Sequence, residues 1–275
     1  MDSVFVVHLT DVHLFAEPGG RLGDVDTDAS LREVLDFLRQ DLLQLGRQPD
    51  LILMTGDLSQ DGSPQAYARL KEAVLDFRAP LAVLPGNHDL HEAFHAEWRE
   101  YEGPWVNLGD WRIVLLDTVV PGSDAGRLAP DQLSLLADAA ARSEGRHVLV
   151  ALHHNPVTDK LDGVDELMLA NAQALFSTVR RQENVRALLW GHVHRPYDQW
   201  LMRDGGEPGE TGGVEPVPDR DIRLLASPST CLQFRVRPGS GDDRPGYRLL
   251  DLLPDGGIRT LVRRVGDGAV GDWLS

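Results

Sequence analysis

The chain has 275 residues and a formal net charge of −16, and 42% of its residues are hydrophobic. This length and composition can build one large core, and the negative charge argues against broad electrostatic binding to nucleic acid or anionic lipid. No apolar run approaches the roughly 20 residues that span a bilayer, and the single cysteine, Cys231, rules out an internal disulfide. We therefore expect a cytoplasmic protein with no membrane insertion and a buried Cys231.

The first two thirds of the chain alternate short apolar runs with helical stretches. The runs are continuously apolar, which indicates strands covered on both faces, as in layered α/β folds. Strands are predicted over 4–9, 51–54, 81–84, 112–116, 148–152 and 185–190. Helices are predicted over 30–46, 63–77, 90–101, 130–142 and 165–181, the first from a capping box at Ser30 and a stop at Gly46.

Beyond residue 195 the alternation gives way to short strands separated by turns. These strands are predicted over 197–202, 222–226, 230–236, 247–253 and 258–265. Residues 203–221 are acidic and rich in Gly and Pro, so we expect a mobile inserted loop. The sequence thus predicts a single domain over 1–265, an α/β sandwich, with a C-terminal tail over 266–275.

Five of the predicted strands end in polar residues that can bind metals. In a strand, residues two apart point to the same side, so Asp11 with His13, and His192 with His194, each form a two-pronged chelate if the strand persists. Ligands in open α/β sheets collect outside the carboxyl ends of the strands. The donors expected there are Asp11, His13, Asp57, Asn87, His153, His192 and His194.

Seven oxygen and nitrogen donors are too many for one four-coordinate zinc site, and none is a thiolate. They suit two metal ions if one carboxylate bridges. Mixed imidazole and carboxylate ligation favours Mn, Fe or Zn over Mg or Ca. Two such ions roughly 3.5–4 Å apart can clamp the oxygens of a phosphoryl group during in-line displacement.

The ordered motifs D-x-H, G-D, G-N-H-D, H and G-H-x-H resemble the signature of the calcineurin-like metallophosphoesterases. They stand here as Asp11-Val12-His13, Gly56-Asp57, Gly86-Asn87-His88-Asp89, His153 and Gly191-His192-Val193-His194. The resemblance implies a sandwich of two mixed β-sheets flanked by helices. It also implies two divalent or trivalent metal ions per chain, Mn and/or Fe with Zn as a further option.

The resemblance also assigns roles to these residues. It places Asp11, His13, Asp57 and His194 on one ion and Asp57, Asn87, His153 and His192 on the other, so Asp57 is the bridge. His88 is expected to contact the scissile phosphate and to protonate or stabilise the leaving oxygen, and Asp89 to orient His88. Asn87, His88 and His194 are the expected substrate contacts. His154 remains an alternative to His153 as ligand and a further candidate for substrate binding.

A finer resemblance concerns the substrate. The segments 227–234, 245–248, 22–27 and 116–122 are similar to parts of bacterial class III 3′,5′-cyclic nucleotide phosphodiesterases of this superfamily. That similarity implies hydrolysis of a cyclic nucleotide, with cAMP favoured, to a nucleoside 5′-monophosphate by a metal-bridging hydroxide. The expected partner is therefore a small-molecule phosphodiester and not nucleic acid, and the oligomeric state is left open, with a homodimer as one option.

Three other functions are alternatives to this one. Another phosphodiesterase or phosphomonoesterase of the same superfamily is the main alternative. A binding module without catalysis is disfavoured because every ligand type and His88 are present. His91-Glu92-Ala93-Phe94-His95 matches the H-E-x-x-H motif of zinc proteases, but it follows Asp89 so closely that an independent site has little room.

Overall fold

The computed structural model describes residues 2–158, 165–206, 221–271 except 235–242, and 273. It contains two mixed sheets and a short hairpin of β2 (Arg21–Leu22) and β3 (Val25–Asp26). The first sheet has the order β13 (Ile258–Arg264), β12 (Gly246–Leu252), β1 (Val4–Leu9), β4 (Leu51–Thr55) and β5 (Leu81–Leu84). The second has the order β10 (Tyr197–Leu201), β11 (Ile222–Ala226), β9 (Val185–Trp190), β8 (His147–Ala151), β7 (Trp111–Leu115) and β6 (Trp105–Leu108).

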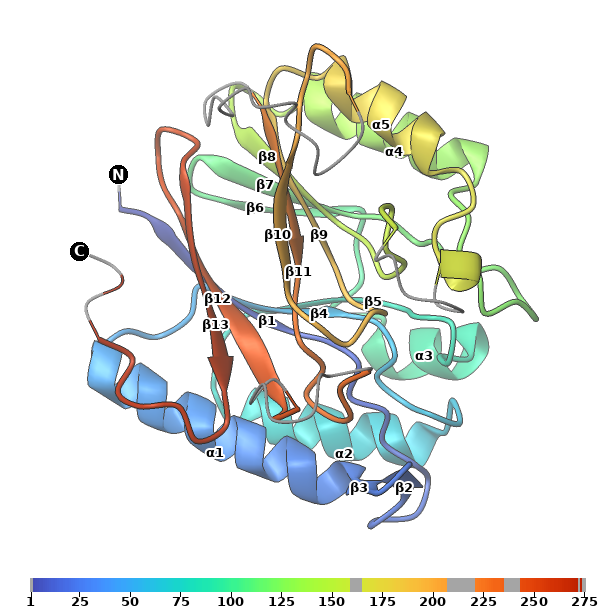
Figure 1. The fold of residues 1–275 in the computed structure, drawn as a ribbon, viewed down its shortest axis with the longest axis vertical. Coiled ribbons are helices and arrows are strands. Elements are labelled where there is room, and N and C mark those ends of the chain that lie inside the picture. The colour runs from blue at the N-terminus through green and yellow to red at the C-terminus, as the bar shows by residue number, and fades with distance from the viewer. Residues whose placement is uncertain (1, 159–164, 207–220, 235–242, 272, 274–275) are drawn as a thin grey trace.

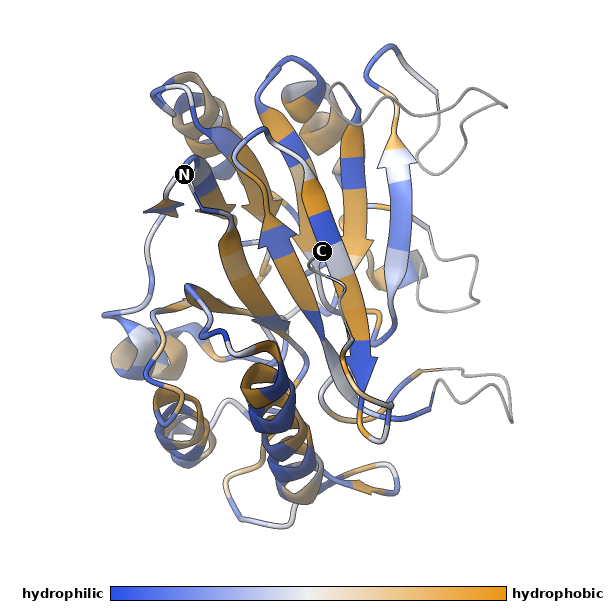
Figure 2. Ribbon diagram, turned by 90° about the vertical axis from the view of Figure 1, so that its left-hand side faces the viewer, coloured by the Kyte–Doolittle hydropathy of each residue, from blue (hydrophilic) through white to orange (hydrophobic). Residues whose placement is uncertain are grey.

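The helices cover the outer faces of the two sheets (Figure 1). Beside the first sheet lie α1 (Thr27–Leu45), α2 (Pro64–Leu75) and α3 (His91–Trp98), and beside the second lie α4 (Pro130–Ala141) and α5 (Ala172–Arg180). A third apolar cluster fills the space between the sheets. The strands are accordingly mostly apolar along their length (Figure 2), and the predicted sandwich of two mixed sheets flanked by helices is confirmed.

Strand direction brings the polar strand ends together. In the first sheet β1, β4 and β5 are parallel neighbours. In the second sheet β8 and β9 are also parallel. Parallel strands present their carboxyl ends at one edge of a sheet, so each sheet contributes one set of polar loops to the same end of the sandwich.

Local structure differs from the sequence prediction at several elements. The first helix begins at Thr27 and is capped by the Asp26 carboxylate, which accepts from Ala29 N, so the predicted cap at Ser30 is wrong. The helix predicted over 165–181 is a 3-10 turn, Asp165–Leu167, followed by the shorter α5. Of the strand predicted over 230–236, residues 230–234 do not form a strand and residues 235 and 236 lie outside the described residues, and both β6 and the β2–β3 hairpin were missed.

The end of the chain is packed rather than loose where the structure describes it. Val270 is buried against the first sheet's outer core, and its N–H donates to the Gln44 side chain. Of the predicted mobile loop over 203–221, positions 207–220 lie outside the described residues. Among the helices that the structure describes, none has the length and apolarity to cross a membrane.

Candidate metal centre

The predicted metal ligands lie in tight loops just past the strands, not in the strands themselves. β1 ends at Leu9, two residues before Asp11. Five of the ligands have a left-handed backbone, with φ between 51° and 67°: Asp11, His13, Asp57, His192 and His194. Asp11 and His13 converge on one group of donors through these turns, whereas His192 and His194 point into different groups, so both the persisting strand and the His192–His194 chelate are wrong. Such strained backbone is held by the surrounding fold and concentrates at functional sites.

The first group of donors surrounds one point between the two sheets. His13 Nε2 lies 3.0 Å from His194 Nε2 and 3.6 Å from Asp57 Oδ2. His194 Nε2 lies 3.5 Å from Asp11 Oδ1. All four side chains are buried. The donor atoms of one predicted ion site are therefore together.

The second group shares the Asp57 carboxylate with the first. His153 Nε2 lies 3.3 Å from Asp57 Oδ2, 3.1 Å from Asn87 Oδ1 and 3.3 Å from His192 Nδ1. His192 Nδ1 is also 3.1 Å from Asn87 Oδ1. Asp57 Oδ2 thus stands between both groups, where a bridging ligand is required.

Three imidazoles are held so that each turns Nε2 toward the donor set and Nδ1 away from it. His13 Nδ1 donates to Gln60 Oε1 at 2.7 Å, His153 Nδ1 to Thr55 O at 2.8 Å, and His194 Nδ1 to Leu232 O at 2.5 Å. A neutral imidazole carries one proton, so the Nε2 atoms of His13 and His194 point inward as lone pairs, and Nε2 of His153 would do so once a bound cation displaces its second proton. Lone pairs 3.0 Å apart repel unless a cation lies between them. Outer hydrogen bonds of this kind are typical of metal-binding histidines, and the residues fit two metal ions.

Burial and neighbouring charges shift the pKa values of the two carboxylates, Asp57 and Asp11, and of the His153 imidazole beside them. Burial opposes ionisation of Asp57, yet the neighbouring His153 and His13 hold its pKa well below the usual range. Burial raises the pKa of Asp11 to about 7, with His153 opposing the rise and Asp57 adding to it. Burial lowers the pKa of His153, but the carboxylate of Asp57 outweighs it and raises that pKa to about 9. Bound cations would stabilise both buried carboxylates as anions.

The other ligand imidazoles are neutral, as metal binding requires. Burial lowers the pKa of His13 to about 4 even though Asp57 opposes the change. Burial, followed by the charge of His153, lowers the pKa of His192 to about 3. Burial, followed by His13, holds the pKa of His194 well below its usual value.

His88 lies at the rim of this centre, and its partner differs from the expected one. Gln60 Nε2 is 3.1 Å from His88 Nδ1, and the His88 and His13 rings meet edge to face at 5.1 Å. The Asp89 carboxylate instead accepts from the backbone N–H groups of residues 58, 59 and 86 and from the Tyr67 hydroxyl. The expectation that Asp89 orients His88 is therefore wrong: Asp89 braces the two ligand loops. Gln60 was missed because a glutamine in a loop carries no sequence signal.

The adjacent histidines at 153 and 154 are distinguished by their partners. His154 is buried, with Nδ1 2.7 Å from Thr118 Oγ1 and Nε2 3.2 Å from Asp124 O. Both of its nitrogens therefore have partners outside the donor set, whereas His153 directs Nε2 into it. This geometry supports His153 as the ligand.

The zinc-protease motif does not build a site. His91 and His95 share a helix face, with ring centroids 5.3 Å apart, but their nitrogens pair separately with Asp117 at 3.3 Å and Glu102 at 2.6 Å. The metal-holding groups found among the described residues do not include either of them. Cys231 is buried as predicted, and burial raises its pKa to about 12, which excludes a reactive thiolate.

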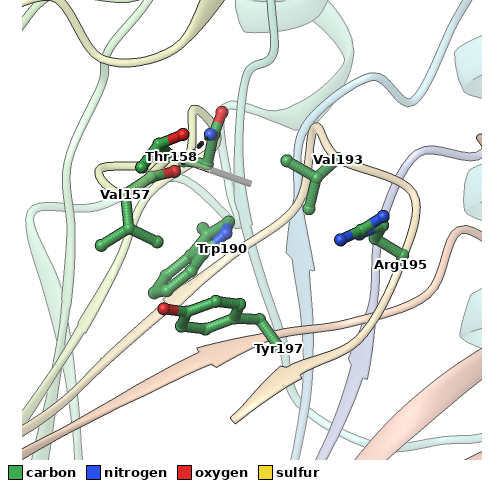
Figure 3. A pocket seen from close by; sticks show the side chains of 7 residues that line it. Val157, Thr158, Trp190, Val193, Arg195 and Tyr197 are labelled. Atoms are coloured by element: carbon green, nitrogen blue, oxygen red, sulfur yellow. Dashed lines mark hydrogen bonds between the residues drawn. The ribbon is translucent and has the colours of Figure 1, made fainter. Parts of the chain in front are cut away.

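A small pocket lies behind the loop that carries His192 and His194 (Figure 3). Val193, between the two ligands, is buried in it, and the Trp190 and Tyr197 rings lie 5.5 Å apart in its wall. Asn155 Nδ2 closes the neighbouring turn by donating to Val157 O at 2.8 Å. Packing of Val193 thereby fixes the loop from which both ligands project.

Comparison with known proteins gives relatives over nearly the whole chain. The family model described as calcineurin-like phosphoesterase matches residues 6–196. A Pseudomonas aeruginosa protein named 3′,5′-cyclic adenosine monophosphate phosphodiesterase CpdA is 42% identical, with 96% of this chain and 91% of that protein covered. A protein of the same name from Escherichia coli K12 is 35% identical, with 96% and 90% covered.

Solved structures with low sequence identity share the fold. A dimetal phosphatase from Danio rerio has a TM-score of 0.60 at 13% identity and covers 97% of this chain and 100% of its own. A purple acid phosphatase from yellow lupin has a TM-score of 0.66 at 11% identity and covers 99% of this chain and 55% of its own. These similarities establish the sandwich architecture for this chain.

Proposed function

This chain belongs to the calcineurin-like phosphoesterase family, and from that membership we propose that it is a metal-dependent phosphodiesterase that hydrolyses 3′,5′-cyclic nucleotides, cAMP among them, to nucleoside 5′-monophosphates. The substrate class follows from the names of the relatives that are 35–42% identical over 96% of this chain. An acidic chain needs local positive charge to bind a phosphodiester, and a metal centre provides it.

One observation carries the metal dependence. The Nε2 atoms of His13 and His194 face each other at 3.0 Å while their Nδ1 atoms donate outward. Hydrogen bonding within the protein leaves these lone pairs unsatisfied, so the cluster is built for cations. Asp11, His13, Asp57 and His194 would hold one ion and Asp57, Asn87, His153 and His192 the other. Imidazole with carboxylate suits Mn, Fe or Zn.

When bound, two such ions supply an activated water and neutralise charge on the phosphoryl oxygens. Side chains of the protein space the donors, fix the loops and contact the substrate. Asp57 spaces the two groups of donors, and its Oδ1 accepts from His88 N at 2.9 Å, which fixes the loop of Asn87 and His88 beside the centre. Asn87, His88 and His194 are the residues we place against the substrate phosphate, and His88 is half-buried rather than enclosed.

The test is steady-state kinetics on the Mn-loaded protein with cAMP, cGMP, 2′,3′-cyclic AMP, bis(4-nitrophenyl) phosphate and 4-nitrophenyl phosphate side by side. We expect hydrolysis of 3′,5′-cyclic nucleotides to 5′-monophosphates, abolished by EDTA and restored by Mn²⁺. Full activity after EDTA treatment would contradict metal dependence. A preference for the monoester would identify a phosphatase instead.

A further inference from the structure

Gln60 joins a metal ligand to the residue beside the substrate. Its Oε1 is 2.7 Å from His13 Nδ1, and its Nε2 is 3.1 Å from His88 Nδ1. The backbone of Gln60 is fixed as well, because its N–H donates to Leu14 O at 2.8 Å. The side-chain amide of Gln60 therefore forms a hydrogen bond with each of the two imidazoles.

The two ends of an amide are chemically different, and this difference sets the protons on both rings. The oxygen can only accept and the NH₂ group can only donate. His13 Nδ1, facing the oxygen, must carry a proton, and His88 Nδ1, facing the NH₂ group, must not. A neutral His88 then carries its proton on Nε2.

The amide cannot be turned over while His13 serves as a ligand. With the amide reversed, His13 Nδ1 would have to accept, and its proton would move to Nε2. That atom lies 3.0 Å from His194 Nε2 and 3.6 Å from Asp57 Oδ2, inside the donor set, and a metal needs a lone pair there. Metal binding at His13 and the proton position on His88 are therefore linked through Gln60.

We propose that Gln60 is a positioning residue that holds His88 as the Nε2–H tautomer whenever His13 ligates a metal. The proposal rests on the proposed function in placing His88 against a phosphodiester. His88 then meets the substrate with its Nε2–H as a hydrogen-bond donor to a phosphoryl oxygen and does not protonate the leaving group. In the hydrolysis a water oxygen forms the new bond to phosphorus, the bond from phosphorus to the 3′ oxygen breaks, and that oxygen takes its proton from solvent.

The direct test is the protonation pattern of His88, read by long-range ¹⁵N–¹H correlation of ¹⁵N-histidine-labelled protein loaded with diamagnetic Zn²⁺. The His88 signals are assigned by their loss in His88→Gln. We expect a protonated Nε2 and an unprotonated Nδ1 in the parent protein. Gln60→Glu, whose carboxylate accepts from both rings, should move a proton to His88 Nδ1 while metal content, measured by elemental analysis, stays at the parent level.

Kinetics give a second readout. They distinguish a His88 that donates a hydrogen bond to the phosphate from a His88 that protonates the leaving group. Turnover is compared on cAMP, which has a poor alkoxide leaving group, and on bis(4-nitrophenyl) phosphate, which has a good one. In Gln60→Ala and Gln60→Glu we expect kcat to fall about 10–100-fold, and by the same factor on both substrates. Gln65→Glu, with the same charge change at an exposed position of α2, should match the parent protein.

Contrary results distinguish a failure of the role of Gln60 from a failure of the proposed function. A protonated His88 Nδ1 in the Zn-loaded parent protein, or a tautomer unchanged in Gln60→Glu, would overturn the role of Gln60. A loss confined to cAMP would also overturn it, because His88 would then act as the acid. If the tautomers are as expected but cyclic nucleotides are not hydrolysed, the proposed function is refuted. The positioning role of Gln60 then still stands.

Discussion

At the scale of single residues, Asp57 is the side chain on which both groups of donors depend. We predict that Asp57→Asn reduces metal content from two ions toward one or none and lowers kcat on cAMP by at least about 1000-fold, since a neutral amide loses the bridging charge. Elemental analysis and kinetics on the purified variant check this. Asp61→Asn, which changes the same charge in the same loop outside the donor set, is the matched control. Two retained ions in Asp57→Asn would show that Asp57 is not the bridge.

His8 is a buried residue whose contribution depends on pH. Its Nδ1 lies 2.5 Å from Ser227 Oγ and its Nε2 2.7 Å from Thr55 Oγ1, so it ties β1 to the ends of β4 and β11. Burial, with the nearby positive charge of Arg248, lowers its pKa to about 3. His8 therefore stays neutral in the folded state over a range where the unfolded chain binds a proton.

The sign of the pH effect follows from this difference. The stabilisation by His8 is fully present above the unfolded pKa of about 6.5 and is lost as the pH falls toward 3. We predict that the difference in unfolding free energy between the parent protein and His8→Gln shrinks by about 2 kcal/mol between pH 6.5 and 5. Urea titrations of both proteins at the two pH values measure it. A difference that is constant with pH would mean that His8 titrates alike in both states.

At the scale of elements, the approach of the β4 and β5 loops leaves no room for a side chain at Gly86. A Cβ there would lie 2.2 Å from Asp57 Oδ1 and 2.4 Å from Asp57 N. We predict that Gly86→Ala displaces Asp57, lowers metal affinity at least about tenfold and destabilises the fold by about 1–3 kcal/mol. Chelator competition and thermal unfolding measure both effects, and Gly103→Ala, where only Trp105 O lies within 4 Å at 3.8 Å, should match the parent protein.

The elements also show what could be read from the sequence. Continuously apolar strands such as Leu51–Met54 predicted the layered fold, because only a sheet covered on both faces buries such a run. The polar residues at the strand ends identified the donors, and all seven lie together. The left-handed turns at Asp11 and His192 could not be predicted, since their φ values are imposed by contacts between distant loops. Partners such as Gln60 were missed for the same reason.

At the scale of the whole molecule, the donors come from both sheets: Asp11, His13, Asp57 and Asn87 follow strands of the first, and His153, His192 and His194 follow strands of the second. Bound ions therefore add a connection between two layers that also meet through an apolar cluster and through hydrogen bonds such as that of His8 with Ser227. A ligand that binds only the folded state stabilises it. We predict that removing metal with EDTA lowers the thermal midpoint by about 5–15 °C and that Mn²⁺ restores it.

That experiment has an internal control. Asp57→Asn should unfold near the midpoint of the chelated parent protein and respond little to EDTA or Mn²⁺. A parent protein whose midpoint is unchanged by chelation would show that the direct contacts between the sheets hold them together without the ions. Differential scanning fluorimetry with and without chelator is sufficient.

The pairing of β1 with β12 constrains when the chain can fold during synthesis. Val4 is opposite Leu252 in an antiparallel ladder, so a central strand of the first sheet gains one neighbour only after residues 246–252 have been made. Domains fold on the ribosome once their contacts are available, and distant pairings are slow to form. The first sheet, which surrounds the Asp11 loop, is completed only after β12 and β13 have been made, whereas the second sheet up to β9 can assemble earlier. Metal capture by a nascent chain should therefore begin only after β12 has left the ribosomal exit tunnel.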